Sequence, residues 1–196
     1  MKALPRVEGR VAVLDRADVD TDQIIPKQFL KRIERTGYGE FLFFDWMKDP
    51  QFELRRPEAA GASILLAGRN FGCGSSREHA AWALEDYGFR AILAPSFGDI
   101  FHSNAIKVGL APVALPAEEL AQVRAAVADR NELLVDLETL EVRHPRGLAF
   151  AFELDSYDQE TLVQGLDDIA RTLRHADAIE AFESQHAARF DTRALV

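Results

Sequence analysis

The chain has 196 residues, 47% hydrophobic and 28% charged, which is enough apolar material for one sizeable core and excludes wholesale disorder. Its 23 Lys and Arg against 32 Asp and Glu give a net charge of −9, which argues against nucleic-acid binding, because duplex binders need a basic face. No apolar run is long enough for a membrane span and the first residues lack the apolar core of a secretory signal, so we expect a cytoplasmic protein.

Strands and helices alternate through the middle of the chain. The strands are predicted at residues 9–14, 62–67, 90–94 and 110–115. The helices are predicted at residues 76–87 and 97–107, with irregular chain around a short helix at 15–40 and an aromatic stretch at 41–46. This order predicts an α/β fold whose parallel sheet has right-handed crossovers.

The last third of the chain has a different pattern. A helix is predicted at 117–129, and residues 132–154 read as two or three antiparallel strands that would make the sheet mixed. The tail, 156–190, is helical by pattern, with breaks near Gly165 and Arg174. Because no linker is apparent, we expect a single domain over 1–196 with a C-terminal helical extension from about residue 156.

The most informative stretch is the glycine-rich segment 68–79, between a buried strand and a helix. Ligands of open α/β sheets bind at the carboxyl ends of strands, and free N–H groups at a helix start favour an anion. Arg77 adds a planar fork suited to a carboxylate or phosphate. Ser75 and Glu78 have the spacing of a capping box, which explains both residues without a ligand. Three glycines in seven residues exceed what a cap needs, and this favours a binding loop.

Several other site types fit less well. The segment lacks the Gly-Lys-Ser/Thr of a phosphate-binding loop, the third glycine of a dinucleotide fingerprint and the Gly-x-Ser-x-Gly of a hydrolase. Cys73 with His79 remains a minor alternative as a thiol nucleophile.

No metal site is expected in this chain. Asp18, Asp20 and Asp22 resemble the start of a calcium loop, but Gln23 and Phe29 replace the glycine and glutamate that such a loop requires. The histidines lack zinc-ligand spacing, and one cysteine cannot provide a thiolate cluster or an internal disulfide framework.

Three motifs, in matching order and spacing, resemble the small subunit of 3-isopropylmalate dehydratase (isopropylmalate isomerase), in the aconitase superfamily. They are VDTDQIIP at 19–26, FGCGSSREHA at 71–80 and FGDIF at 97–101, the last followed by Asn104 and Gly109. The resemblance implies a swivelling β/β/α domain like the last domain of aconitase, with a mostly parallel mixed sheet.

The same resemblance implies a partner and a reaction. The partner is a large subunit that carries a [4Fe–4S] cluster on three cysteines, in a heterodimer with this chain. The reaction is the dehydration and rehydration that moves a hydroxyl of a small dicarboxylate from C2 to C3, through 2-isopropylmaleate, in leucine biosynthesis. A homoaconitase-type or other hydro-lyase small subunit, or a stand-alone anion-binding module, remains an alternative.

The resemblance also assigns roles to residues. Ser75 would be the base that removes a proton from carbon, Arg77 would bind a substrate carboxylate, and Asp22 would orient charged partners near the substrate. Gly74 and Ser76 would complete the substrate site, and Ser76 could serve the helix start in place of Ser75.

By the same resemblance, residues 29–32 fall where related small subunits carry their substrate-discriminating loop. Ile24, Ile25, Phe29 or Leu30 would form an apolar wall for an isopropyl group. Lys31 and Arg32 would either hold an additional carboxylate, as homoaconitase needs, or be solvated. The aromatic stretch 41–46 and a tail face are more often core than partner contact. That tail face consists of Ile169, Leu173, Ile179 and Phe182.

Overall fold

The computed structural model describes residues 1–31 and 34–185 and divides into two compact units, Met1–Gly165 and Leu166–Val196. Arg32, to which the sequence assigned a specificity role, lies outside the described residues. Within the described parts of both units, no helix has the length and apolar character needed to cross a bilayer.

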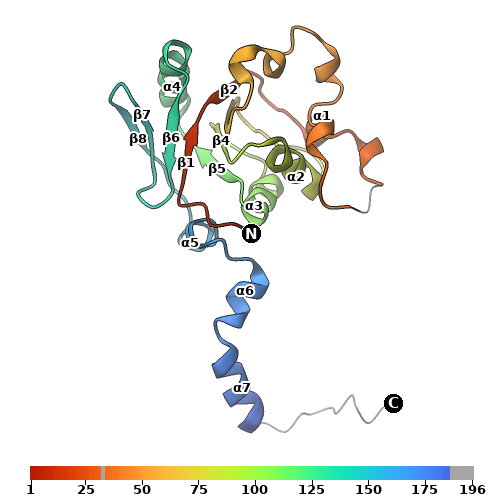
Figure 1. Ribbon diagram of the computed structural model, residues 1–196, viewed down its shortest axis with the longest axis vertical. Coiled ribbons are helices and arrows are strands. Elements are labelled where there is room, and N and C mark those ends of the chain that lie inside the picture. Colours follow the sequence, from red (N-terminus) through yellow and green to blue (C-terminus); the bar gives the residue numbers. More distant parts are fainter. Residues whose placement is uncertain (32–33, 186–196) are drawn as a thin grey trace. The chain divides into compact units, whose positions relative to one another are not determined.

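The first unit contains a four-stranded parallel sheet with the strand order β2-β3-β4-β5 (Figure 1). Its strands are β2 (Val11–Leu14), β3 (Ile64–Ala67), β4 (Ala91–Ala94) and β5 (Ala111–Ala114). The two central strands, β3 and β4, are buried at every position, because both faces of this sheet are covered. Pro112 is accommodated on β5, which is an edge strand.

A second, antiparallel sheet has the strand order β1-β6-β7-β8. Its strands are β1 (Arg6–Gly9), β6 (Leu133–Asp136), β7 (Glu141–His144) and β8 (Leu148–Ala151). The antiparallel strands predicted at 132–154 are confirmed, but they form their own sheet instead of extending a mixed one. The single strand predicted at 9–14 is two strands, since the chain changes sheets between Gly9 and Val11.

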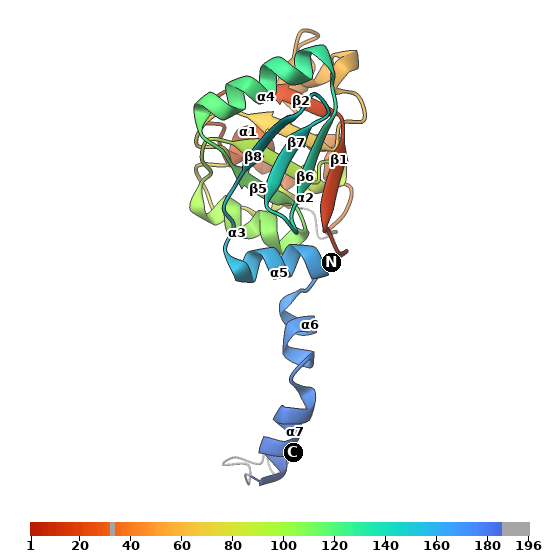
Figure 2. The same ribbon diagram turned by 90° about the vertical axis from the view of Figure 1, so that its left-hand side faces the viewer.

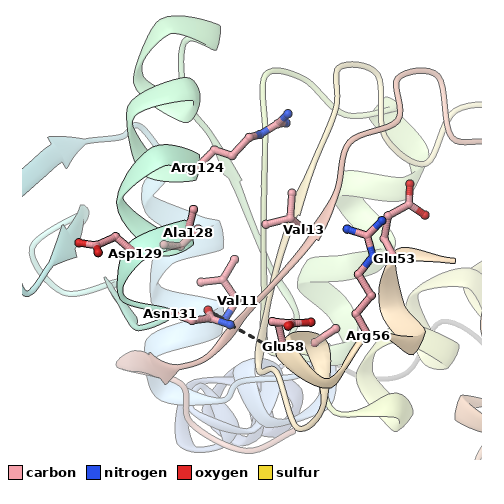
Figure 3. A pocket seen from close by; sticks show the side chains of 11 residues that line it. Val11, Val13, Glu53, Arg56, Glu58, Arg124, Ala128, Asp129 and Asn131 are labelled. Carbon is pink, nitrogen blue, oxygen red and sulfur yellow. Dashed lines mark hydrogen bonds between the residues drawn. The ribbon is translucent and has the colours of Figure 1, made fainter. Parts of the chain in front are cut away.

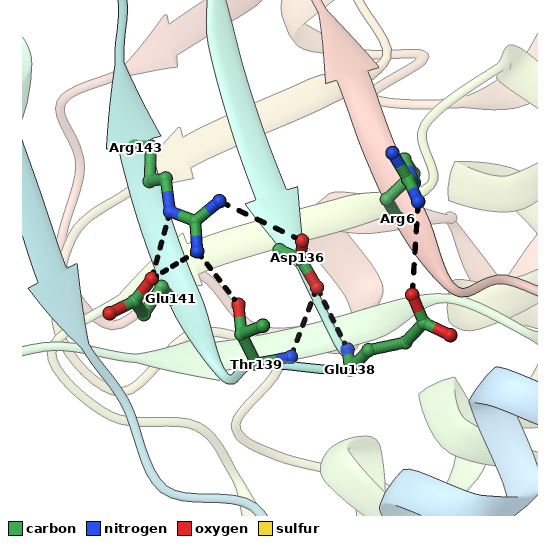
Figure 4. A network of polar contacts seen from close by, with 6 residues as sticks. All are labelled: Arg6, Asp136, Glu138, Thr139, Glu141 and Arg143. Atoms are coloured by element: carbon green, nitrogen blue, oxygen red, sulfur yellow. Dashed lines mark hydrogen bonds and ion pairs between the residues drawn. The ribbon is translucent and has the colours of Figure 1, made fainter.

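A polar network surrounds the turn between β6 and β7, the two central strands of the antiparallel sheet (Figure 4). The Asp136 carboxylate accepts hydrogen bonds from the backbone N–H groups of Glu138 and Thr139, both at 3.0 Å. Arg143 extends toward the same carboxylate and also pairs with Glu141. The Thr139 N–H bond, helped by that of Glu138, lowers the pKa of Asp136 despite its burial. The network therefore fixes the turn between β6 and β7.

The helices complete a β/β/α arrangement, which confirms the expected fold class (Figure 2). Helices α2 (Glu78–Tyr87) and α3 (Asp99–Val108) contact each other and pack in the core on one face of the parallel sheet. Helix α4 (Ala117–Asp129) and the antiparallel sheet share a second core on its other face. Helix α5 (Ser156–Gln164) buries Leu162 in that second core.

Between β2 and β3 the chain forms helix α1 (Thr21–Ile24) and short 3₁₀ turns. Phe43 and Leu42, in the aromatic stretch, are fully buried, which agrees with a core role. Phe29 stacks on Phe41 with ring centroids 4.1 Å apart, so this aromatic packing supports the segment after α1.

The second unit contains α6 (Asp168–Leu173) and α7 (Ala176–Gln185), and the predicted breaks near Gly165 and Arg174 are confirmed. Gly165 ends α5 in the left-handed conformation that glycine adopts easily. The four apolar residues of the predicted tail face are exposed, so the expectation that they belong to the core is wrong for this chain. They are Ile169, Leu173, Ile179 and Phe182. Partner contact by this face stays a prediction.

Candidate active site

The glycine loop connects the carboxyl end of β3 to the start of α2, as the sequence predicts. Gly72 and Gly74 have φ angles of +75° and +93°, which side chains rarely adopt. A Cβ at Gly72 would also lie 2.1 Å from Cγ of Phe101, so α3 packs directly against the loop. Glycine is therefore required at position 72 both for its backbone angle and for this close approach.

The start of α2 differs from the predicted one. The helix begins at Glu78 instead of Ser76, and Arg77 occupies the N-cap position without any side-chain cap. The expected capping box of Ser75 and Glu78 is absent, and Ser76 does not replace it. Ser75 is exposed, and its hydroxyl makes no hydrogen bond within residues 1–31 and 34–185. The hydroxyl is thus available to a ligand.

Helix α1 brings a second loop against the first. Asp20 and Cys73 form an isolated parallel bridge, and the Thr21 N–H donates to the Cys73 carbonyl at 3.0 Å. The buried Thr21 hydroxyl donates to the Ser75 carbonyl, also at 3.0 Å. Thr21 therefore fixes the backbone of Ser75, a role that the local pattern around a short acidic helix did not indicate.

These contacts unite the three predicted catalytic residues. Asp22, in the first turn of α1, forms an ion pair with Arg77 Nη1 across the two loops. The Arg77 side chain is only 15% exposed, whereas that of Asp22 is 50% exposed. A largely buried guanidinium held by a carboxylate lies two residues along the chain from the exposed Ser75. The residues therefore form one constellation at the carboxyl edge of the parallel sheet.

The titratable neighbours of this constellation are shifted toward their neutral forms. Burial, followed by the nearby carboxylates of Asp20 and Asp18, raises the pKa of the Cys73 thiol. Because only the thiolate is a strong nucleophile, this shift speaks against the minor alternative of a cysteine nucleophile. Burial also lowers the pKa of His79, which packs with its ring centroid 4.7 Å from that of Trp82.

The predicted apolar wall is only partly available. Ile24 and Ile25 have no exposed surface and pack in the core, so their assignment to the substrate site is wrong for this conformation. Hydrophobicity alone does not reveal which side of a four-residue helix faces inward. Phe29 and Leu30 are half-buried and Lys31 is exposed, so these three can still face a substrate. Gly74 and Ser76 are exposed beside Ser75, and their part in the substrate site stays a prediction.

No group of three or more His, Cys, Asp or Glu side chains within the described ranges is arranged to hold a metal ion. The acidic run is engaged in the chain's own contacts: Asp20 caps α1 in a capping box with Gln23, and Asp22 pairs with Arg77. With one cysteine in the chain, a three-cysteine iron–sulfur cluster does not fit here.

A cavity of about 400 Å³ lies elsewhere, between β2, α4 and the chain around residue 56 (Figure 3). Its charged groups are mostly paired within the chain: Arg124 with Asp15, Glu53 with Arg16, and Asp129 with Arg146. None of its lining residues belongs to α1 or to the glycine loop. The cavity therefore offers little unbalanced charge and is separate from the constellation around Ser75.

Comparisons with known proteins place the chain in a family. The family profile described as the aconitase C-terminal domain matches residues 1–118, and the profile for the C-terminal domain of the 3-isopropylmalate dehydratase small subunit matches residues 168–191. The 3-isopropylmalate dehydratase small subunit of Acidobacterium capsulatum is 52% identical over 192 residues, covering 97% of this chain and 93% of that protein. The corresponding protein of Bacillus subtilis is 52% identical over 194 residues, covering 95% and 98%.

A solved structure agrees with these matches. The crystal structure of 3-isopropylmalate dehydratase from Methanocaldococcus jannaschii is 27% identical, with a TM-score of 0.68, and the match covers 90% of this chain and 99% of that one. Because the likeness extends over nearly the whole sequence, the chain belongs to the family of 3-isopropylmalate dehydratase small subunits, in the aconitase superfamily.

Proposed function

We propose that this chain is the small subunit of a hydro-lyase that interconverts 2-isopropylmalate and 3-isopropylmalate through 2-isopropylmaleate. The observation that carries the proposal is the constellation of an uncapped, exposed Ser75 beside an Arg77 that Asp22 holds in place. The relatives' names supply the substrate, and the geometry supplies groups suited to its chemistry. The partner is a large subunit, and the two chains act as a heterodimer.

Removal of a proton from carbon beside a carboxylate requires a positioned base. Ser75 takes this role as an alkoxide, which becomes a hydroxyl when the proton leaves the substrate carbon. An alkoxide needs positive potential and N–H donors around it. The uncapped start of α2 and the guanidinium of Arg77 provide both, and the Thr21 bond to the Ser75 carbonyl holds the backbone still.

Arg77 binds a carboxylate of the substrate. A guanidinium has five N–H donors, and Asp22 engages Nη1. The other donors are left for a planar, two-pronged contact with a substrate carboxylate. Asp22 then acts as an orienting residue, since it holds the fork at the edge of the loop. In a chain with a net charge of −9, the remaining N–H donors of Arg77 and the uncapped start of α2 are the groups that hold the dianion.

The iron–sulfur cluster implied for this superfamily belongs on the large subunit. This chain has one cysteine, and its described residues form no group of metal ligands. The steps assigned here are therefore those of this chain alone: binding the carboxylate and accepting the proton.

An activity assay of the chain with and without its large-subunit partner tests the proposal. We expect conversion of 3-isopropylmalate to the unsaturated acid, followed by its ultraviolet absorbance, only when both chains are present. Homoaconitate is the comparison substrate, and its preferred turnover would instead support a homoaconitase-type enzyme. Purification of the chain from its host without any iron–sulfur partner, and without turnover of either acid, would favour a stand-alone anion-binding module.

A further inference from the structure

Two residues with left-handed backbone lie side by side in the two loops that carry the candidate active site. Asp18, in the loop after β2, has a φ angle of +55°, and Asn70, in the loop after β3, has one of +56°. Among residues with a side chain, aspartate and asparagine adopt this conformation most readily. Two such residues in neighbouring loops indicate a specific local arrangement that their contacts must stabilise.

Asp18 ties the two loops together. Its Oδ1 accepts a hydrogen bond from Asn70 Nδ2 at 2.9 Å, and its Oδ2 pairs with Arg69 Nη2 at 3.0 Å. Its own N–H donates to the Arg69 carbonyl at 2.9 Å. The backbone N–H of Asn70 donates in turn to Ser96 Oγ at 2.9 Å, which links the pair to the end of β4. The Asp18 side chain thus joins the loops after β2 and β3, and the Asn70 N–H adds the loop after β4.

The same pairing continues from Asp18 to the proposed base. The Gly72 N–H donates to the Val19 carbonyl at 2.8 Å, and the Thr21 N–H donates to the Cys73 carbonyl at 3.0 Å. The Thr21 hydroxyl then reaches the Ser75 carbonyl. Asp18 therefore begins a series of contacts between the two loops, and the last of these contacts fixes the backbone of Ser75. Asp22 follows Asp18 on the same segment of the chain.

We propose that Asp18 is a positioning residue, whose hydrogen bond to Asn70 sets the register between the loop of Asp22 and the loop of Ser75. The inference rests on the roles proposed above for Ser75 and Asp22. The ion pair with Arg69 is secondary, because the two side chains are 48% and 69% exposed and such pairs contribute little in water. The hydrogen bond to Asn70 is exposed as well, but it joins two residues that both have left-handed backbone, and this geometry is the feature that matters.

Two variants separate the positioning role of the Asp18 side chain from the effect of its charge. Asp18→Gly keeps the left-handed backbone accessible but deletes the side chain, whereas Asp18→Asn keeps both the conformation and an oxygen that can accept from Asn70. In the heterodimer we expect Asp18→Gly to lower kcat by about tenfold with KM within about threefold, since a small misplacement of reacting groups is costly. The Asp18→Asn variant should have a kcat within about twofold of the parent value, and so should the Arg69→Ala variant.

Amide hydrogen exchange provides a readout that does not depend on turnover. In Asp18→Gly, the N–H groups of Gly72 and Thr21 should exchange faster, while that of Leu84 in the middle of α2 should be unchanged. Faster exchange at Leu84 as well would show general unfolding and would overturn the proposal.

Two further outcomes of the kinetic measurements would contradict the positioning role of Asp18. Full activity of Asp18→Gly would overturn the positioning role, and so would an Asp18→Asn variant as impaired as Asp18→Gly, because charge would then be the operative property. If Ser75→Ala kept its activity, the proposed function of Ser75 would fail, yet the exchange at Gly72 and Thr21 would still report whether Asp18 joins the loops.

Discussion

The first turns of α1 and α2 lie side by side, but they are completed in opposite ways. Helix α1, with four residues, has a full capping box: the Asp20 carboxylate accepts from Gln23 N–H at 2.8 Å, and Gln23 Oε1 accepts from Asp20 N–H at 3.0 Å. Helix α2, with ten residues, has no side-chain cap at all. The shorter helix is stabilised by its own sequence, whereas the longer one relies on core packing and leaves its start open to a ligand.

The capped start of α1 has a structural role, whereas the uncapped start of α2 is open to a ligand. At a capped helix start, side chains already accept from the free N–H groups and offset the helix dipole, so few donors remain for an anion. An uncapped start keeps both, and here it lies next to Ser75 and Arg77. We therefore expect substitutions at α2 to affect turnover and substitutions at the α1 cap to affect stability.

The largest effect should come from Ser75→Ala. We expect turnover to fall by about a thousandfold, the middle of the range for loss of a positioned base. Because Ser75 caps nothing, the melting temperature of the chain and its association with the large subunit should be unchanged. Steady-state kinetics of the heterodimer, with size-exclusion chromatography of the mixture, provide both measurements. A variant with substantial activity would refute the assignment of Ser75 as the base.

Arg77→Lys should have the next largest effect. A lysine keeps the charge but cannot make a planar two-pronged contact, so we expect KM to rise by roughly 10- to 100-fold. Arg69→Lys is the matched control, since Arg69 belongs to an exposed ion pair, and its KM should stay at the parent value. An unaltered KM in Arg77→Lys would show that Arg77 does not bind the substrate.

Asp20→Ala tests the structural role of the capped start of α1. Loss of the α1 cap should lower the free energy of unfolding by about 1 kcal/mol, the usual value for an N-cap residue. Ser75→Ala is the control here and should change that free energy by less than about 0.5 kcal/mol. Chemical denaturation of both variants measures the difference. Equal destabilisation by the two substitutions would mean that α2 is capped by Ser75 after all.

The smallest effect concerns Asp136, far along the chain from either helix start. Its folded pKa is lowered, so its charge stabilises the fold above the ordinary aspartate pKa of about 4, and this contribution is lost as pH falls through the folded pKa. Asp136→Asn keeps an acceptor oxygen but removes the charge. We expect the variant to be less stable than the parent by about 1 kcal/mol or less at pH 7.

Denaturation at several pH values checks this sign. The gap between parent and Asp136→Asn should be constant above the ordinary aspartate pKa and should close below it. Turnover of the Asp136→Asn heterodimer should match the parent, because the network braces the antiparallel sheet and not the glycine loop. A gap that widened in acid would contradict the lowered pKa.

Much of the fold was accessible from local pattern. The buried runs at 62–67 and 90–94 and the glycines after the helices mark β3, β4 and their neighbours, because burial on both faces leaves continuous apolar runs. The division between two sheets was not accessible. Nothing in a single run from residue 9 to 14 shows that its first residue pairs with Leu133 and its later ones with β3.

The candidate site shows the same limit. Ser75, Arg77 and Asp22 were identified by motif, and their proximity is a property of the fold. The motif Ser-x-x-Glu predicted a cap that is absent, since the backbone of Ser75 is instead held by Thr21 from another loop. Asp18 and Asn70 read as ordinary loop residues, because their left-handed angles and their mutual contact arise only when the two loops meet.

The change of sheet after Gly9 has a consequence for the order in which the molecule forms during synthesis. Strand β1 must wait for β6, more than a hundred residues later, and the Leu4 N–H finds its acceptor only on Leu162. By contrast, β2 to β5 become available in turn, each beside the strand made before it. A growing chain can therefore build the parallel sheet first, with residues 4–9 unpaired until β6 and α5 have been made.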